Sequence, residues 1–88
     1  MEFEPSYQFL IDSLTPVSSE EDAVSVVNRA ILNVRVEKRT LYEVDDFIRI
    51  CQELTTGEDR RIRTIGFSSI TQARTYRLLK ISEKFKRF

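Results

Sequence analysis

Residues 40–57 read TLYEVDDFIRICQELTTG, and this stretch decides the fold of the chain. Apolar residues recur in it at the three- and four-residue spacing of one helix face. That stripe consists of Val44, Phe47, Ile48, Cys51 and Leu54. Thr40 and Glu43 have the spacing of a capping box, and Gly57 is a typical helix stop. The pattern therefore predicts an amphipathic helix between Thr40 and Gly57.

Two further helices are predicted before this one. The first begins near Pro5, where the missing backbone donor does no harm, and ends at residues 15–16, Thr-Pro. The second begins near residue 19, because Ser18 and Glu21 form another capping box, and continues to about residue 34. A strand at residues 34–36 is the alternative for the end of this segment.

The fourth helix is expected after a break in the helical period. Residues 60–65, RRIRTI, alternate in part and predict a short strand or an extended loop. Ser69 and Gln72 then form a third capping box, and a helix runs from there nearly to the end. Five apolar residues of this helix share an arc of roughly 100°, which we expect to face the core. They are Ile70, Leu78, Ile81, Phe85 and Phe88.

These elements predict an all-α fold, a small four-helix bundle-like domain that spans residues 1–88, with the one short strand near residues 60–65 left open. We expect the second and third helices at its centre and the fourth packed across them. No stretch is long enough in apolar residues to cross a membrane, and the N-terminal residues do not resemble a secretory signal. A single cysteine cannot form an internal disulfide. These features predict a cytoplasmic protein.

The composition argues against catalysis. The 88 residues include no histidine, which removes the commonest general base near neutral pH and the commonest imidazole metal ligand. Cys51 lies on the apolar face of its helix and is expected to be a buried packing residue. Neither Gly57 nor Gly66 belongs to a phosphate-binding motif. We therefore expect no enzyme activity, no catalytic residue, no cofactor and no metal.

Charge is separated along the chain although the total is zero. Residues 1–59 contain thirteen acidic and five basic residues, a net charge of −8. Residues 60–88 contain nine basic residues and one acidic residue, a net charge of +8. A cationic surface on the fourth helix and the segment before it is the strongest functional signal in the sequence. Its candidate binding residues are Arg60, Arg61, Arg63, Arg74, Arg77, Lys80, Lys84 and Arg87.

This cationic surface has two interpretations. In the first, the chain is a small non-enzymatic interaction or regulatory module, and its basic C-terminal helix binds an acidic protein or a second copy in a homodimer. The second interpretation is nucleic-acid binding. We do not expect an anionic membrane surface to be the partner. The opposing expectation for the same cations is that they pair with the acidic residues of the chain's own first 59 positions.

A short stretch is similar to a known DNA-binding motif. The residues GFSS at 66–69, followed by ARTYRLLK at 73–80, resemble the turn and recognition helix of helix-turn-helix domains. The resemblance implies that helix 68–86 reads DNA, with Arg77 and Lys80 nearer the phosphates. The residues that it places toward the major groove are Ser68, Ser69, Thr71, Gln72, Arg74 and Thr75. The sequence departs from the motif because roughly a dozen residues, 55–66, separate the two helices, where the motif uses three or four.

Overall fold

The computed structural model describes residues 2–85, and side chains up to Glu83, as four α-helices. They are α1 (Tyr7–Leu14), α2 (Glu20–Asn33), α3 (Val44–Leu54) and α4 (Arg60–Phe85). Within residues 2–85 the only β-type pairing is an isolated antiparallel bridge between Ser6 and Leu41. The predicted all-α, four-helix fold is therefore confirmed.

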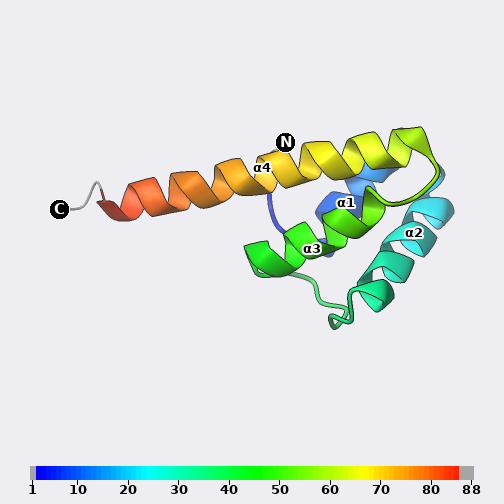
Figure 1. Ribbon diagram of the computed structural model, residues 1–88, viewed down its shortest axis with the longest axis horizontal. Coiled ribbons are helices and arrows are strands. Elements are labelled where there is room, and N and C mark those ends of the chain that lie inside the picture. Colours follow the sequence, from blue (N-terminus) through cyan, green and yellow to red (C-terminus); the bar gives the residue numbers. More distant parts are fainter. Residues whose placement is uncertain (1, 86–88) are drawn as a thin grey trace.

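The four helices are unequal in length, and this sets the shape of the molecule. A helix of 26 residues such as α4 is about 39 Å long, whereas the 11 residues of α3 span about 16 Å. Figure 1 shows α1, α2 and α3 gathered beside the first half of α4, while the second half continues beyond them. The principal extents of 46 × 24 × 20 Å reflect this projection.

Residues 60–65 form the first turns of α4, so the predicted strand or extended loop is wrong. The carboxylate of Asp59 accepts a hydrogen bond from the Arg61 N–H at 2.9 Å, as a residue at the N-cap does. Ile62 and Ile65, three residues apart, pack partly buried against the core. The apparent alternation of RRIRTI was therefore the spacing of one helix face.

Two of the expected capping boxes are displaced. At α2 the N-cap is Ser19, whose hydroxyl accepts a hydrogen bond from the Asp22 N–H at 3.1 Å, while the Ser18 hydroxyl donates to the carbonyl of Leu14. At α3 the helix begins at Val44, with no side-chain capping bond. Residues 40–42 cannot be helical because they pair with the N-terminal segment. The Tyr42 N–H donates to the Pro5 carbonyl at 2.8 Å, and the Thr40 carbonyl accepts from the Tyr7 N–H at 3.1 Å.

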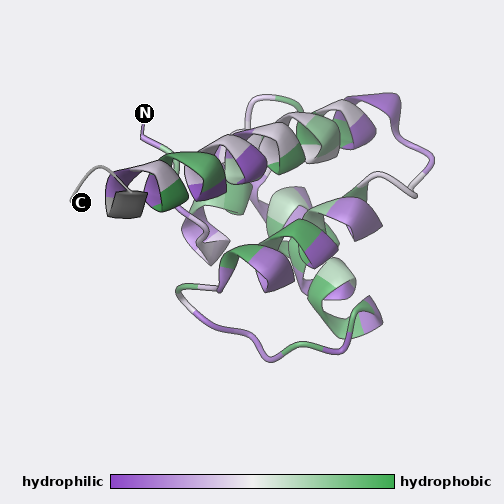
Figure 2. Cartoon of the chain, turned by 60° about the vertical axis from the view of Figure 1, so that its left-hand side comes forward, coloured by the Kyte–Doolittle hydropathy of each residue, from purple (hydrophilic) through white to green (hydrophobic). Residues whose placement is uncertain are grey.

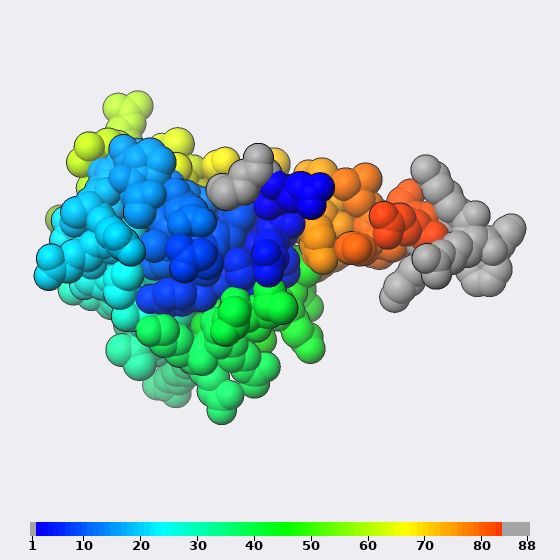
Figure 3. All heavy atoms as spheres, turned by 180° about the vertical axis from the view of Figure 1, so that it is seen from behind, coloured from blue at the N-terminus to red at the C-terminus, as the bar shows by residue number. Residues whose placement is uncertain are grey.

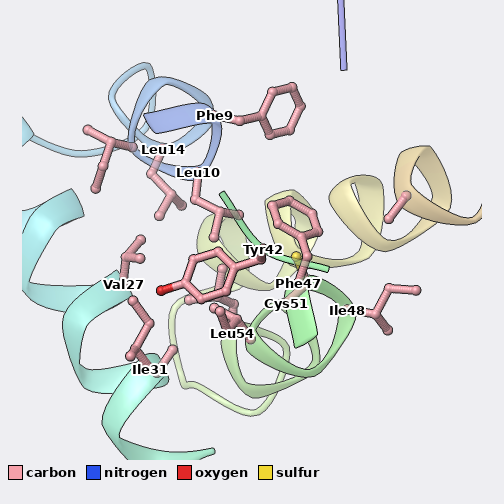
Figure 4. Close-up of a cluster of buried hydrophobic side chains, with 14 of the residues drawn as sticks. Phe9, Leu10, Leu14, Val27, Ile31, Tyr42, Phe47, Ile48, Cys51 and Leu54 are labelled. Carbon is pink, nitrogen blue, oxygen red and sulfur yellow. The ribbon is translucent and has the colours of Figure 1, made fainter. Parts of the chain in front are cut away.

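One core joins all four helices (Figure 4). Its largest fully buried side chains are Phe47, Leu10, Leu14, Ile50, Val27 and Cys51. Phe3 extends this core: its ring lies edge-on to Phe9 and Phe47, with centroids 4.9 and 5.3 Å away, and 5.3 Å from the ring of Tyr76 on α4. The N-terminal segment therefore links α1 and α3 to the middle of α4.

The fourth helix packs chiefly on α3 and to a smaller extent on α1. Within residues 2–85, α2 packs on α1 and α3 and makes no comparable approach to α4, so the expected packing of the fourth helix across the second is wrong. In Figure 1, α3 and α4 run side by side in opposite directions, joined by residues 55–59. The third helix, rather than the second and third together, is the centre of the fold.

Small residues allow α3 and α4 to approach closely. Gly66, Ser69 and Ala73 of α4 are all buried, at the spacing of one helix face. A Cβ atom on Gly66 would lie only 3.0 Å from the Cys51 carbonyl oxygen and 3.2 Å from the Leu54 Cβ. Ser69 is therefore an interior residue of α4, and the prediction that the helix begins there is wrong.

The Gly66→Ala substitution should destabilise the fold by up to about 2 kcal/mol. Overpacking against α3 costs about 1–3 kcal/mol, offset by about 1 kcal/mol of helix propensity gained. Gly57→Ala is the matched control, because its Cβ would meet only the Leu54 carbonyl oxygen at 3.8 Å and its φ is not positive. Urea unfolding of both variants measures the difference. An equal stability of the two variants would contradict the close α3–α4 contact.

Helix α2 ends in a Schellman motif that contains an arginine where glycine is usual. Arg35 has a φ of 59°, while the Val36 N–H donates to the Ile31 carbonyl at 3.3 Å and the Arg35 N–H to the Leu32 carbonyl at 3.2 Å. Side chains other than glycine are strained in this left-handed conformation.

Replacing Arg35 with glycine should therefore stabilise the protein. The strain relieved is about 1–2 kcal/mol, and the added freedom of glycine in the unfolded chain costs about 0.5–1 kcal/mol, which leaves a gain of about 0.5–1 kcal/mol. Thermal unfolding of R35G against R35K, which keeps the charge and the strain, measures this gain. A midpoint for R35G at or below that of R35K would exclude strain at this turn.

Candidate interaction surface on α4

The eight predicted cationic residues do not form one surface. Arg60, Arg61 and Arg63 lie in the first turn of α4, and Arg74, Arg77 and Lys80 lie in its second half. Residues 63 and 74 are separated by about 16 Å along a helix. Lys84 belongs to α4, but its side chain is outside the described part of the chain, as is the whole of Arg87.

In the first group, Arg61 and Arg63 contact the turn between α3 and α4. The Arg63 guanidinium donates hydrogen bonds to the carbonyls of Gly57 and Glu58, both at 3.2 Å. Arg61 lies 3.8 Å from the Asp59 carboxylate. Arg60 is exposed and has no ion pair within residues 2–83. These contacts give Arg61 and Arg63 a local structural role.

The second group is only partly neutralised by the protein itself. Arg77 forms an ion pair with Asp45 at the start of α3. Lys80 lies 3.9 Å from Glu83 and 5.5 Å from the centroid of the Tyr76 ring. Arg74 is exposed and makes no ion pair with any described side chain. Because the paired groups are themselves largely exposed, water and salt screen them, and they stay accessible to a partner.

Apolar side chains accompany these cations. Leu78, Leu79 and Ile81 are 66%, 61% and 45% exposed. The prediction that Leu78 and Ile81 face the core is wrong, although Ile70 of the same arc is buried. The reason is that α3 begins at Val44, beside Arg77, so beyond that point α4 borders open grooves instead of a packed helix. Figure 2 shows hydrophobic turns persisting toward the C-terminal end of α4. The predicted positions of Phe85 and Phe88 lie outside the described side chains.

We call residues 77–85 of α4 the distal segment. Figure 3 shows it from behind, projecting from the rest of the molecule in orange and red. At about 100° per residue, the Leu78 side chain is turned by about 150° from the face that packs on α3, and the Ile81 side chain by about 90°. The line of the α3-facing residues instead continues into Lys80. Leu78 therefore points away from the body of the protein, whereas Leu79 and Ile81 line grooves on either side of it.

A shallow groove adjoins the distal segment on one side. It measures about 430 Å³ and lies between the N-terminal segment and α4. Phe3, Tyr76 and Leu79 contribute its apolar wall, and Glu2, Lys80 and Glu83 add charge. No pattern in the sequence predicted Phe3 at this surface. Leu79 could have been noticed, because it falls outside the arc predicted to face the core.

The resemblance to a helix-turn-helix is not reproduced in the geometry. Residues 66–69, which it assigns to the turn, lie inside α4, and Ser69 is buried against α3. The actual turn spans residues 55–59, and the helices it joins run side by side. The residues that the resemblance assigns to the start of a reading helix are therefore in the middle of one.

Comparisons with protein-family models, with curated proteins and with solved structures found no match to this chain. Among the described residues, no helix combines the length and the apolar character that a membrane crossing requires. In the same part of the chain, no three histidine, cysteine, aspartate or glutamate side chains are grouped so that they could hold a metal ion.

Cys51, the one thiol of the chain, is buried in the core. Burial raises the pKa of this thiol to about 12, because the thiolate would lose its hydration. At neutral pH it is therefore a neutral packing group of low nucleophilicity.

The raised pKa of Cys51 predicts a loss of stability at alkaline pH. In the unfolded chain the thiol ionises around pH 9.0, whereas in the folded protein it ionises around pH 12, so its contribution is complete below pH 9 and falls as the pH rises through that window. At pH 10 the loss attributable to Cys51 is about 1.4 kcal/mol. Comparing the pH dependence of unfolding in the wild type and in Cys51→Ala isolates this effect from the tyrosines and lysines. Parallel curves between pH 8 and 10 would contradict it.

Proposed function

We propose that this chain is a small non-enzymatic interaction module that binds a protein partner through the distal segment of α4. The observation that carries the proposal is the exposure of Leu78, Leu79 and Ile81 on a helix end that extends beyond the body. Burying such side chains is favourable by about 25 cal/mol per Å² of apolar area. Contiguous apolar groups on a surface commonly mark an interaction site.

The charge of the same region supports an acidic partner. Arg74, Arg77, Lys80 and Lys84 lie on the second half of α4, and Glu83 is its only acidic residue. Complementary charge steers the encounter of two proteins and fixes their orientation. Burial of the apolar side chains stabilises the complex, and the cations favour a partner whose surface is acidic.

Catalysis is left out of the proposal on chemical grounds. The chain has no histidine to act as a general base. Burial holds Cys51 as a thiol, with its pKa raised to about 12.

Nucleic-acid binding receives less support from the geometry. The cations are split between two ends of α4, and the assigned reading helix has no free N-terminus at residue 68. Duplex DNA and single-stranded RNA therefore serve as comparison ligands rather than as the proposed partner.

The double substitution L78E/L79E should abolish partner capture. Two carboxylates would replace the apolar surface without touching the core, so circular dichroism should remain that of the wild type. The matched control is L32E/L41E, because Leu32 and Leu41 are 75% and 55% exposed on other parts of the molecule. Affinity capture from the source cells, quantified by mass spectrometry, should show proteins retained by the wild type and the control and lost by L78E/L79E. An identical set of proteins from all three would refute the proposed function.

A further inference from the structure

The outward side of α4 has the spacing of a coiled-coil seam. Counting from Phe67, the residues at alternating steps of four and three are Phe67, Thr71, Arg74, Leu78 and Ile81, and the same steps reach Phe85. In heptad notation Thr71 and Leu78 occupy a positions, and Phe67, Arg74 and Ile81 occupy d positions. A straight helix drifts by only about 20° per heptad relative to this repeat, so the five side chains form one stripe. We call this stripe the seam.

The seam lies outside the close α3–α4 contact, although Thr71 also lines the groove beside Phe3, and Ile81 lines a groove with Glu43 and Asp45. Phe67 is 60% exposed, and all five of its side chains are exposed. The residues that pack on α3 lie at other heptad positions, with Gly66 and Ala73 at c and Ser69 at f. Helix α4 thus packs one side on the core. It exposes a second side, the seam, whose residues have the spacing at which two helices pair.

The charge beside the seam is positive on one flank and neutral on the other. Arg77 and Lys84 occupy g positions, while the e positions hold Thr75 and Ser82. Arg74 lies within the seam and has no ion pair among the described side chains. A guanidinium has five N–H donors, so Arg77 can bind a further carboxylate while it contacts Asp45.

This charge pattern disfavours a second copy as the occupant of the seam. In a parallel pair, Arg74 would face Arg74 of the other copy at the d position. In an antiparallel pair, the g positions would bring Arg77 of one copy beside Lys84 of the other. Like charges at such positions are destabilising.

We propose that the seam docks an amphipathic helix of a partner protein, with aliphatic side chains against Leu78 and Ile81 and acidic side chains against Arg74 and Arg77. The inference rests on the proposed function and specifies the partner's chemistry. It also selects one side of α4: Leu78 lies in the seam, whereas Leu79, one residue on and about 100° around the helix, lines the groove with Phe3.

The probe is a labelled synthetic helix of three heptads with leucine at a and d and glutamate at e and g. Repulsion between its own glutamates opposes self-association at neutral pH. Two comparison peptides replace the glutamates with lysine, or move the leucines off the seam while keeping the composition. Fluorescence anisotropy with the full chain should show at least tenfold tighter binding of the first peptide than of either comparison, weakening as salt is raised.

Two single substitutions, at side chains of similar exposure, test which face of α4 binds the peptide. L78E should weaken binding of the acidic peptide by about tenfold or more, and L79E should leave it within about twofold, because the buried area lies only on the Leu78 side. R74E should also weaken binding of the acidic peptide, and it should bind the lysine peptide more tightly than the wild type does. The salt dependence should decrease in R74E.

Several results would overturn the inference. Loss of peptide binding in L79E but not in L78E would place docking in the groove beside Phe3. Sedimentation that shows a dimer of the wild type lost in L78E would make a second copy the occupant. Binding to vesicles of anionic lipid, or to DNA, without binding to the acidic peptide would identify another class of ligand. In each case the capture experiment with L78E/L79E still decides the proposed function on its own.

Discussion

The structure depends on the close contact between α3 and α4 at Gly66, Ser69 and Ala73. Larger side chains at these positions would separate the two helices and open the core around Cys51 and Leu54. The contact also fixes the register of the helices, because only one stretch of α4 is small enough to lie against α3. Everything C-terminal to Ala73 is placed by that register.

The unequal lengths of the two helices then produce the distal segment. The chain turns at residues 55–59, and α4 runs back along α3 until α3 reaches its own start at Val44. The ion pair of Arg77 with Asp45 marks this end. Tyr76 is the last large side chain that the core supports, through its contact with Phe3. The exposure of Leu78 is thus a consequence of where α3 begins.

The sequence was sufficient for properties that depend on local pattern. The four helices, the all-α fold and the burial of Cys51 follow from periodicity and punctuation, and the structure agrees with them. It was insufficient where the same local pattern serves two purposes. Ser69 and Gln72 match a capping box, yet small residues of this kind also permit close helix packing, and only the position of α3 distinguishes the two.

The candidate surface shows the same limit in another form. Periodicity correctly grouped Ile70, Leu78 and Ile81 on one side of a helix, but a face is buried only if a neighbour reaches it. Ile70 has that neighbour and Leu78 does not. Likewise, the count of basic residues from 60 to 88 was correct, while the continuous helix distributes them over two ends. Neither the exposure of Leu78 nor the separation of the basic residues can be predicted from the sequence of α4 alone.

The distal segment is also suited to binding by the way it is ordered. A helix of its length would scarcely form alone, because nucleation is costly, but it continues a helix that is already packed on α3. Its side chains are thus presented in a fixed arrangement, and a partner need not supply the free energy to order them. Bending α4 toward the body would bring Lys80 inward rather than Leu78, because the Leu78 side chain is turned by about 150° from the face that packs on α3. Burial of Leu78 therefore requires another molecule.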